Sequence, residues 1–335
     1  MRQMKRILAG VVLWILLLSG CTSSPVDSYK LLREAGQAVE EGDLQRALQD
    51  YDRLTELMPQ NGAVYNGRGA VLLELGKYEP ALSDLEKAVE LDDGNTVYWY
   101  NLGLARYCLQ DYEGSVEDFS RALSLNAKYA DAYGRRAAAY ACLGRYEEAE
   151  TDLERAEDLA PGQNATYLAL LGSAYLTAGE TERAKVLLDQ AIEIDSDHPE
   201  YYLQRAQAQI LAGQYEQAQE DCVQAISMRE GFLAGYAVLG DLYYAQQQYE
   251  QAIANYTVAL LEQPDAEGYL IRGKCYAALG KYEEAETDFT QAILLEPDMA
   301  SAYVERGDVR EQMGDPDEAL KDYKKARDLL REGEE

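Results

Sequence analysis

Few side chains in this 335-residue chain could carry acid–base or metal chemistry. Its one histidine lies in the run Asp195-Ser196-Asp197-His198-Pro199, which excludes any mechanism or metal site that needs two histidines. The two aspartates could attract a hard cation, but the run lacks the glycine and the distal glutamate of a calcium-binding loop. Serine and carboxylate chemistry stay open, although no nucleophile elbow, phosphate loop or paired-cysteine site is present. We therefore expect a protein that is not an enzyme, with no metal and no cofactor, and with His198 in an exposed linker.

The charge balance argues against nucleic acid as a partner. The chain holds 31 Lys and Arg against 60 Asp and Glu, a formal net charge of -29. Binding to a phosphate backbone needs clustered cations. Apolar residues at 47% and charged residues at 27% are typical of a chain that can bury a core. The 27 tyrosines, against 3 Phe and 2 Trp, indicate a recurring structural position rather than one binding site.

Residues 1–20 have the pattern of a secretory signal peptide. Three cations in residues 1–6 precede an apolar run over residues 7–18, which is too short to span a bilayer. The run Leu18-Ser19-Gly20-Cys21 resembles the lipobox of bacterial lipoproteins, in which the cysteine becomes the lipid-carrying N-terminus. This resemblance implies acyl chains such as palmitate on Cys21 and a tether over residues 21–27. It also implies a place in the bacterial cell envelope, anchored to a membrane on its extracytoplasmic side.

Two alternatives to the lipoprotein remain, an ordinary cleaved signal and an uncleaved anchor. Which membrane would hold the lipid is also open, because the sequence does not say whether the organism has one membrane or two.

A 34-residue period fills the rest of the chain. The run Leu-Gly-Lys-Tyr-Glu at residues 75–79 returns at 279–283, and Tyr-Glu-Glu-Ala-Glu-Thr-Asp occurs at both 146–152 and 282–288. This pattern resembles the tetratricopeptide repeat, a helix-turn-helix with conserved small and aromatic positions. The resemblance implies an all-α fold, a right-handed α-solenoid of about nine repeats. The predicted repeats of the array 28–333 are 28–61, 62–95, 96–129, 130–164, 165–198, 199–232, 233–265, 266–299 and 300–333.

Small residues recur at fixed positions when each repeat is numbered 1 to 34. Position 8 is Gly or Ala in all nine repeats, and positions 20 and 27 are Ala in eight each, so we expect closely packed helices. Positions 4, 11, 17 and 24 hold 19 of the 27 tyrosines. Because the repeats run to residue 333, we expect one continuous core and no attached catalytic domain. Arg310, followed by Glu311 and Gln312, indicates a polar cap on the last repeat.

Glycine at the turn between the two helices should adopt the left-handed conformation that ends the first helix. Gln110 and Gln247 replace this glycine in two repeats, which predicts strained turns there.

Four cysteines follow the lipobox. Cys108 and Cys142 are 34 residues apart and occupy the same position in successive repeats. Neighbouring helices pack about 8 to 10 Å apart, beyond the roughly 7 Å Cα separation that a disulfide allows. We therefore expect free thiols, buried or facing the groove, at Cys108, Cys142, Cys222 and Cys275.

The resemblance also implies that the first helix of each repeat lines a concave groove, through positions 2, 5, 6, 9, 12 and 13. In the third to sixth repeats these positions are mostly apolar or aromatic, which is typical of protein-docking surfaces. Toward the C-terminus the same face turns acidic, with Asp241, Glu267, Glu305, Asp308 and Glu311. We predict that the groove binds a peptide segment or a domain of another envelope protein, whose identity stays open. The predicted groove residues are Val97, Tyr100, Asn101, Leu104, Tyr107, Arg135, Leu170 and Gln207.

Three other interpretations of this face and one of the last helix stand beside that prediction. The groove residues could simply fill the inner curve of the solenoid. A carboxylate clamp, known from some tetratricopeptide co-chaperones, needs five residues, of which Asn101 and Arg135 match. Cell-wall glycan could stack on Tyr100, Tyr107 and Tyr244. Finally, the last helix could pair with a second copy of the chain.

Overall fold

The computed structural model describes residues 25–229, 231–261 and 264–332. In these ranges the chain forms eighteen α-helices and no strand, which confirms the predicted all-α solenoid fold. None of these helices is long and apolar enough to cross a membrane. The predicted signal peptide and Cys21 lie outside the described residues. The first described helix begins at Pro25, inside the predicted tether.

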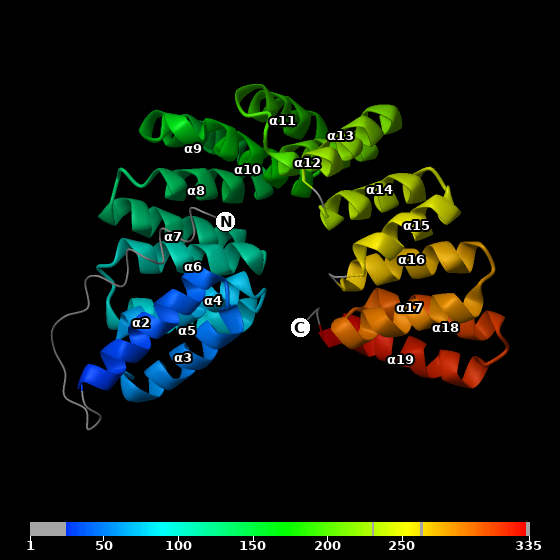
Figure 1. Ribbon diagram of the computed structural model, residues 1–335, viewed down its shortest axis with the longest axis horizontal. Helices are drawn as coiled ribbons and strands as arrows, with labels where there is room; N and C mark the ends of the chain where they lie inside the picture. The colour runs from blue at the N-terminus through cyan, green and yellow to red at the C-terminus, as the bar shows by residue number, and fades with distance from the viewer. Residues whose placement is uncertain (1–24, 230, 262–263, 333–335) are drawn as a thin grey trace. The chain divides into compact units, whose positions relative to one another are not determined.

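The helices divide into two compact units between Ala178 and Gly179. In unit 1, consecutive helices pack as antiparallel pairs, and each pair packs on the next (Figure 1). Its elements are α2 (Pro25–Glu41), α3 (Leu44–Leu57), α4 (Gly62–Glu74), α5 (Tyr78–Leu91), α6 (Thr96–Cys108), α7 (Tyr112–Leu125), α8 (Ala130–Cys142), α9 (Tyr146–Leu159), the 3-10 turn η1 (Pro161–Gln163) and α10 (Asn164–Thr177).

Unit 2 repeats the same local arrangement from Gly179 onward. Its elements are α11 (Thr181–Ile194), α12 (Pro199–Leu211), α13 (Tyr215–Met228), α14 (Leu233–Ala245), α15 (Tyr249–Ala259), α16 (Ala266–Ala278), α17 (Tyr282–Leu295), α18 (Ala300–Gln312) and α19 (Pro316–Glu332).

The predicted fifth repeat is divided between the two units, because the boundary falls between α10 and α11. What distinguishes this part of the chain from the other repeats is the connection that leads into α10. That helix is reached through the proline-led turn η1, whereas no other described first helix follows such a turn. With this entry, α10 packs broadly on α8 as well as on α9. Its apolar side chains Leu168, Leu171 and Tyr175 are buried within unit 1.

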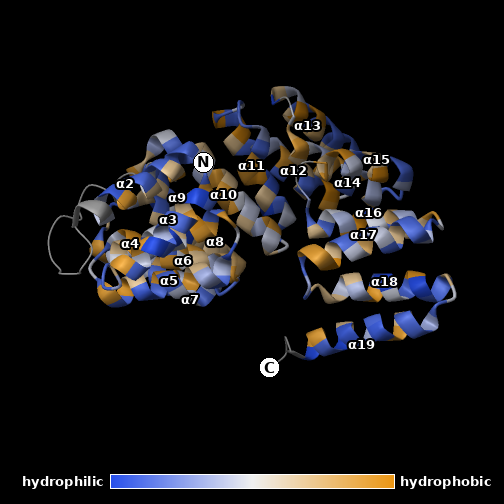
Figure 2. Cartoon of the chain, turned by 60° about the horizontal axis from the view of Figure 1, so that its bottom comes forward, coloured by the Kyte–Doolittle hydropathy of each residue, from blue (hydrophilic) through white to orange (hydrophobic). Residues whose placement is uncertain are grey.

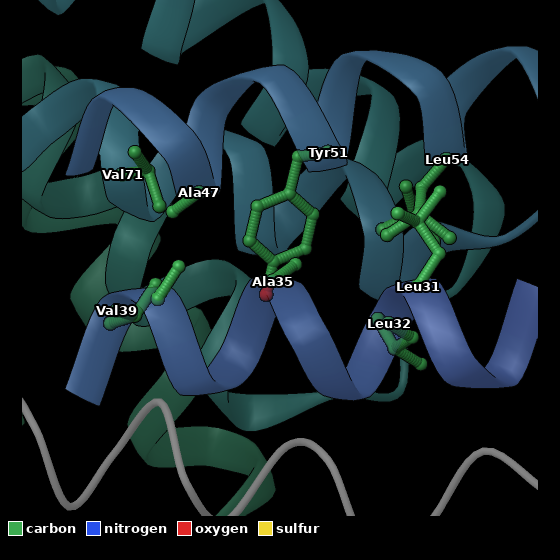
Figure 3. Packing of buried hydrophobic residues seen from close by; sticks show 10 residues of the cluster. Leu31, Leu32, Ala35, Val39, Ala47, Tyr51, Leu54 and Val71 are labelled. Atoms are coloured by element: carbon green, nitrogen blue, oxygen red, sulfur yellow. The ribbon is translucent and has the colours of Figure 1, made fainter. Parts of the chain in front are cut away.

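Close packing inside each helix pair explains why position 8 is small. A Cβ added to Gly103 would lie 2.8 Å from the Phe119 ring, and one added to Gly273 would lie 2.6 Å from the Phe289 ring. In Figure 3 the corresponding pair is Ala35 of α2, which lies against the Tyr51 ring of α3. The two helices of a pair therefore approach as closely as the large residue at position 24 permits.

The two glutamine turns adopt the backbone that was expected of glycine. Gln110 has φ 63° and Gln247 has φ 59°, against 70° for Gly76 and 72° for Gly280 in the equivalent turns. A side chain is disfavoured in this left-handed region, so the predicted strain is confirmed at both turns.

An ion pair within five of the repeats was missed by the sequence analysis. In the fourth repeat, Arg136 at position 7 donates from Nε to Asp152 Oδ2 at 2.6 Å and from Nη2 to Oδ1 at 2.8 Å. Its guanidinium also lies 5.5 Å from the centre of the Tyr133 ring. We call this the Arg–Asp clip. The five clips are Arg68–Asp84, Arg136–Asp152, Arg205–Asp221, Arg272–Asp288 and Arg306–Asp322.

The remaining guanidinium nitrogen of each clip reaches the preceding repeat. Arg136 Nη1 donates to Ser120 Oγ at 2.9 Å, and Arg205 Nη1 donates to Asp189 Oδ1 at 2.6 Å. The accepting residue is always at position 25, and the five acceptors are Asp52, Ser120, Asp189, Thr257 and Thr290. The clip thus joins two helices of one repeat to the repeat before it. Its signal in the sequence is an arginine followed sixteen residues later by an aspartate.

Arg310, one of the residues that indicated a polar cap, pairs with carboxylates of unit 2. It is half-buried, with Nε 2.7 Å from Glu286 Oε1 and Nη1 2.8 Å from Asp322 Oδ2. A long side chain at position 11 of α18 can reach back to α17, where an acceptor meets it.

The four described cysteines are free thiols, as expected. Cys222 and Cys275 are buried, and burial raises the pKa of each to about 12. Cys142 is half-buried and Cys108 is exposed.

Candidate functional site

Seven of the eight predicted groove residues lie on the first helices of unit 1. Val97, Tyr100, Asn101, Leu104 and Tyr107 come from α6, while Arg135 comes from α8 and Leu170 from α10. The eighth, Gln207, is exposed on α12 of unit 2.

Tyr100 is a packing residue of α6. Only 5% of it is exposed, and its ring centre lies 4.9 Å from that of Tyr129 and 5.7 Å from that of Phe119. Burial raises the pKa of its hydroxyl, and the nearby Arg135 opposes that rise. The Tyr100 ring therefore presents no face on which a partner side chain or a sugar could stack.

Asn101 is also occupied within the chain. Its Nδ2 donates to Oδ1 of Asn66 on α4 at 2.8 Å, and both side chains are buried. This amide contact joins neighbouring first helices. It leaves Asn101 little freedom to take the place that a carboxylate clamp would require.

The other five residues are half-buried and form what we call the unit 1 strip, namely Val97, Leu104, Tyr107, Arg135 and Leu170. The Tyr107 ring meets Tyr112 edge-on at 5.4 Å, and its hydroxyl lies 3.7 Å from Cys142 Sγ. Burial is the main cause that raises the pKa of Tyr107. The strip is therefore a mostly apolar, partly accessible surface built on the rigid first helices α6, α8 and α10.

Arg135 gives the strip its charge. Eleven Lys and Arg side chains in the described ranges are half-buried, and ten of them have a carboxylate oxygen within 4 Å. Among those eleven, Arg135 alone has none. Its charge reaches the hydroxyl of Tyr100 and the thiol of Cys108, where it opposes the rise in pKa that burial causes. A half-buried cation without a counter-charge suits a ligand that carries a negative group.

The corresponding helices of unit 2 carry charge of the opposite sign. Asp241 of α14 accepts a hydrogen bond from the Tyr256 hydroxyl, and burial raises the pKa of Asp241 to about 6. On α16 and α18, Lys274 Nζ lies 3.4 Å from Glu305 Oε1. The two carboxylates agree with the acidic character that the sequence indicated for the C-terminal part of the groove face.

His198 lies at the start of α12, where half of its side chain is exposed. Its Nε2 is 3.1 Å from Asp195 Oδ2. In the part of the chain that the structure describes, no three His, Cys, Asp or Glu side chains come together as metal ligands.

Comparison with known proteins identifies the repeat. Six family models described as tetratricopeptide repeat match the chain, over residues 32–96, 97–129, 128–197, 175–221, 266–299 and, for one model, both 233–265 and 300–329. No curated protein matches the sequence.

Two solved structures share the fold, and a third is similar over part of this chain. A tetratricopeptide repeat protein from Parabacteroides merdae is 20% identical with a TM-score of 0.51, over 83% of this chain and 97% of that one. The anaphase-promoting-complex hetero-tetramer Cut9-Hcn1 is 17% identical with a TM-score of 0.51, over 92% and 58%. MamA is 25% identical with a TM-score of 0.41, over 48% and 94%.

Proposed function

Because the chain belongs to the tetratricopeptide repeat family, we propose that it is a non-enzymatic scaffold whose unit 1 strip binds a segment or a domain of another cell-envelope protein. The observation that carries this proposal is the combination of partly accessible apolar side chains with Arg135, a half-buried cation that has no carboxylate partner among the described residues. Apolar contacts would supply most of the binding free energy, and the arginine would select the register of the partner.

The experiment compares two variants by crosslinking in cells, followed by affinity capture and mass spectrometry. The test variant combines Leu104→Ala, Tyr107→Ala and Arg135→Gln, and it leaves the buried Tyr100 and Asn101 intact. The control variant combines Glu154→Ala and Arg155→Gln, two exposed residues on the outer helix α9. We expect a protein partner that the wild-type chain and the control capture and that the test variant loses.

Capture of the same partner by the test variant would contradict the strip as the binding surface. Recovery of wall material alone would favour the glycan interpretation, which the burial of Tyr100 makes less suitable.

We further propose that lipid on Cys21 anchors the scaffold to the extracytoplasmic face of a membrane. The lipobox-like run that ends at Cys21 supports this proposal. Growth with labelled palmitate should label the wild-type chain, whereas Cys21→Ser should abolish both the label and recovery in the membrane fraction. A labelled Cys21→Ser chain would refute the anchor.

A further inference from the structure

The links between neighbouring repeats have a fixed polarity. In all five clips the donor is an arginine at position 7 of a first helix, and the acceptor lies at position 25 of the preceding second helix. Position 7 therefore faces the repeat before it, and position 25 faces the repeat after it.

The first and last described helices reverse this polarity. Position 7 of α2 is Glu34, an acceptor, and position 25 of α19 is Lys324, a donor. Glu34 is half-buried and forms an ion pair with Lys30 of its own helix at 3.5 Å. Lys324 is exposed, and none of the described carboxylates lies within ion-pair distance of it. If another first helix with the sequence of α2 stacked on α19, Glu34 and Lys324 would meet with opposite charges. The acceptor would then lie at position 7 and the donor at position 25, the reverse of the internal contacts.

The outer face of α19 is uncovered in the described structure. Every other second helix of unit 2 has the next first helix packed against it, whereas α19 packs closely on α18 alone. Most of α19 is hydrophilic in Figure 2, yet Leu320 is half exposed. Leu320 occupies position 21 of its repeat. In the preceding repeat, position 21 is Glu286 of α17, and Arg310 of the next first helix, α18, contacts it. Leu320 therefore lies on the face that would receive another first helix, and a covering helix would bury it.

We propose that two copies of this chain associate head to tail, with α2 of one copy packed on α19 of the next and Glu34 paired with Lys324. Charge complementarity and the position 7 to position 25 register select this occupant for the α19 face. A contact between unlike ends repeats from copy to copy, and it gives a closed ring where the rotation between copies closes and an open chain where it does not. This proposal goes beyond partner binding by the strip and does not depend on it.

Sedimentation of the purified full chain over a wide range of concentration tests the proposal. The weight-average mass should rise with concentration past that of a dimer. Glu34→Lys and Lys324→Glu should each weaken association by roughly tenfold, because each replaces an attractive pair with a like-charge contact. The double variant should associate as the wild type does. An equimolar mixture of the two single variants should also associate, because each then meets a complementary end.

The matched control is Lys325→Glu, which makes the same charge change one residue away on α19 and should leave association unchanged. Circular dichroism melts of all variants separate lost folding from lost association. A chain that stays monomeric at every concentration, an assembly that stops at the dimer, or single variants that associate as the wild type does would each overturn the proposal.

Discussion

Units 1 and 2 are built by the same packing rules and differ in what their first helices expose. Both contain Arg–Asp clips, small residues at position 8 and one glutamine turn. The first helices of unit 1 nevertheless present the apolar strip around Arg135, whereas those of unit 2 present Asp241, Lys274 and Glu305. Features that both units share therefore stabilise the scaffold. A function specific to one unit must depend on the side chains that its first helices expose. Each prediction below makes a matched change in each unit.

The largest effect should come from breaking a clip. Asp152→Ala in unit 1 and Asp288→Ala in unit 2 each leave a half-buried arginine without its carboxylate. We expect each to lower the free energy of unfolding by about 2 to 3 kcal/mol. Urea unfolding followed by Trp99 fluorescence reports on unit 1, and hydrogen exchange reports on unit 2.

The control for the clip is Arg155→Ala, an exposed arginine that should change stability little. A loss in one unit only would show that the clip is not a shared structural device.

Enlarging position 8 should have the next largest effect. Gly103→Ala and Gly273→Ala place a methyl group against Phe119 and Phe289, and we expect each to destabilise its unit by about 1 to 2 kcal/mol. Thermal melts measure the loss.

Shrinking the opposing ring should restore stability, since the fourth repeat has Ala137 at position 8 and Leu153 at position 24. The double variants Gly103→Ala/Phe119→Leu and Gly273→Ala/Phe289→Leu provide that check. Single variants as stable as the wild type would refute the packing argument.

Two carboxyl groups, on the buried Asp118 and the half-buried Asp241, should make stability depend on pH. Burial raises the pKa of Asp118 from its ordinary 3.8 to about 7, against the opposing effect of Arg106, and raises that of Asp241 to about 6. The folded state then holds a proton that the unfolded state has lost. Stability should fall as pH rises from about 4 to 7 in unit 1 and from about 4 to 6 in unit 2, by at most about 1.4 kcal/mol per pH unit.

Asp118→Asn and Asp241→Asn should each flatten this slope in their own unit. Unfolding measured at several pH values checks this, and an unchanged slope would show that the aspartate is ionised throughout.

The smallest effect should come from relieving the strained turns. Gln110→Gly and Gln247→Gly suit the positive φ of these residues, and each should stabilise its unit by about 0.5 to 1 kcal/mol. Paired thermal melts would show it. A destabilised variant would mean that the glutamine side chain contributes more than the strain removes.

The sequence predicts most of the scaffold because local rules determine it. The 34-residue period, the small position 8 and the strain at Gln110 depend on contacts within one helix pair. The division at Ala178 was missed because it depends on how α10 enters and packs on α8. The Arg–Asp clip was missed although its sixteen-residue spacing is visible in the sequence.

The candidate site was only partly predictable. Helix position assigned Tyr100 and Asn101 to an exposed face, but burial is decided by neighbouring side chains. Tyr129 and Phe119 enclose Tyr100, and Asn66 engages Asn101. Arg135 was predicted as a groove residue from its helix position, and only the structure shows that none of the described carboxylates lies within ion-pair distance of it.

The guanidinium nitrogen with which each clip arginine reaches the preceding repeat also influences the order in which the repeats should unfold. These links join the first repeat to the second, the third to the fourth, the fifth to the sixth, and the last three to one another. In a nearest-neighbour description of folding, each such link adds to the coupling between the two repeats that it joins. The last three repeats, which two consecutive links join within unit 2, should therefore open as a single cooperative block.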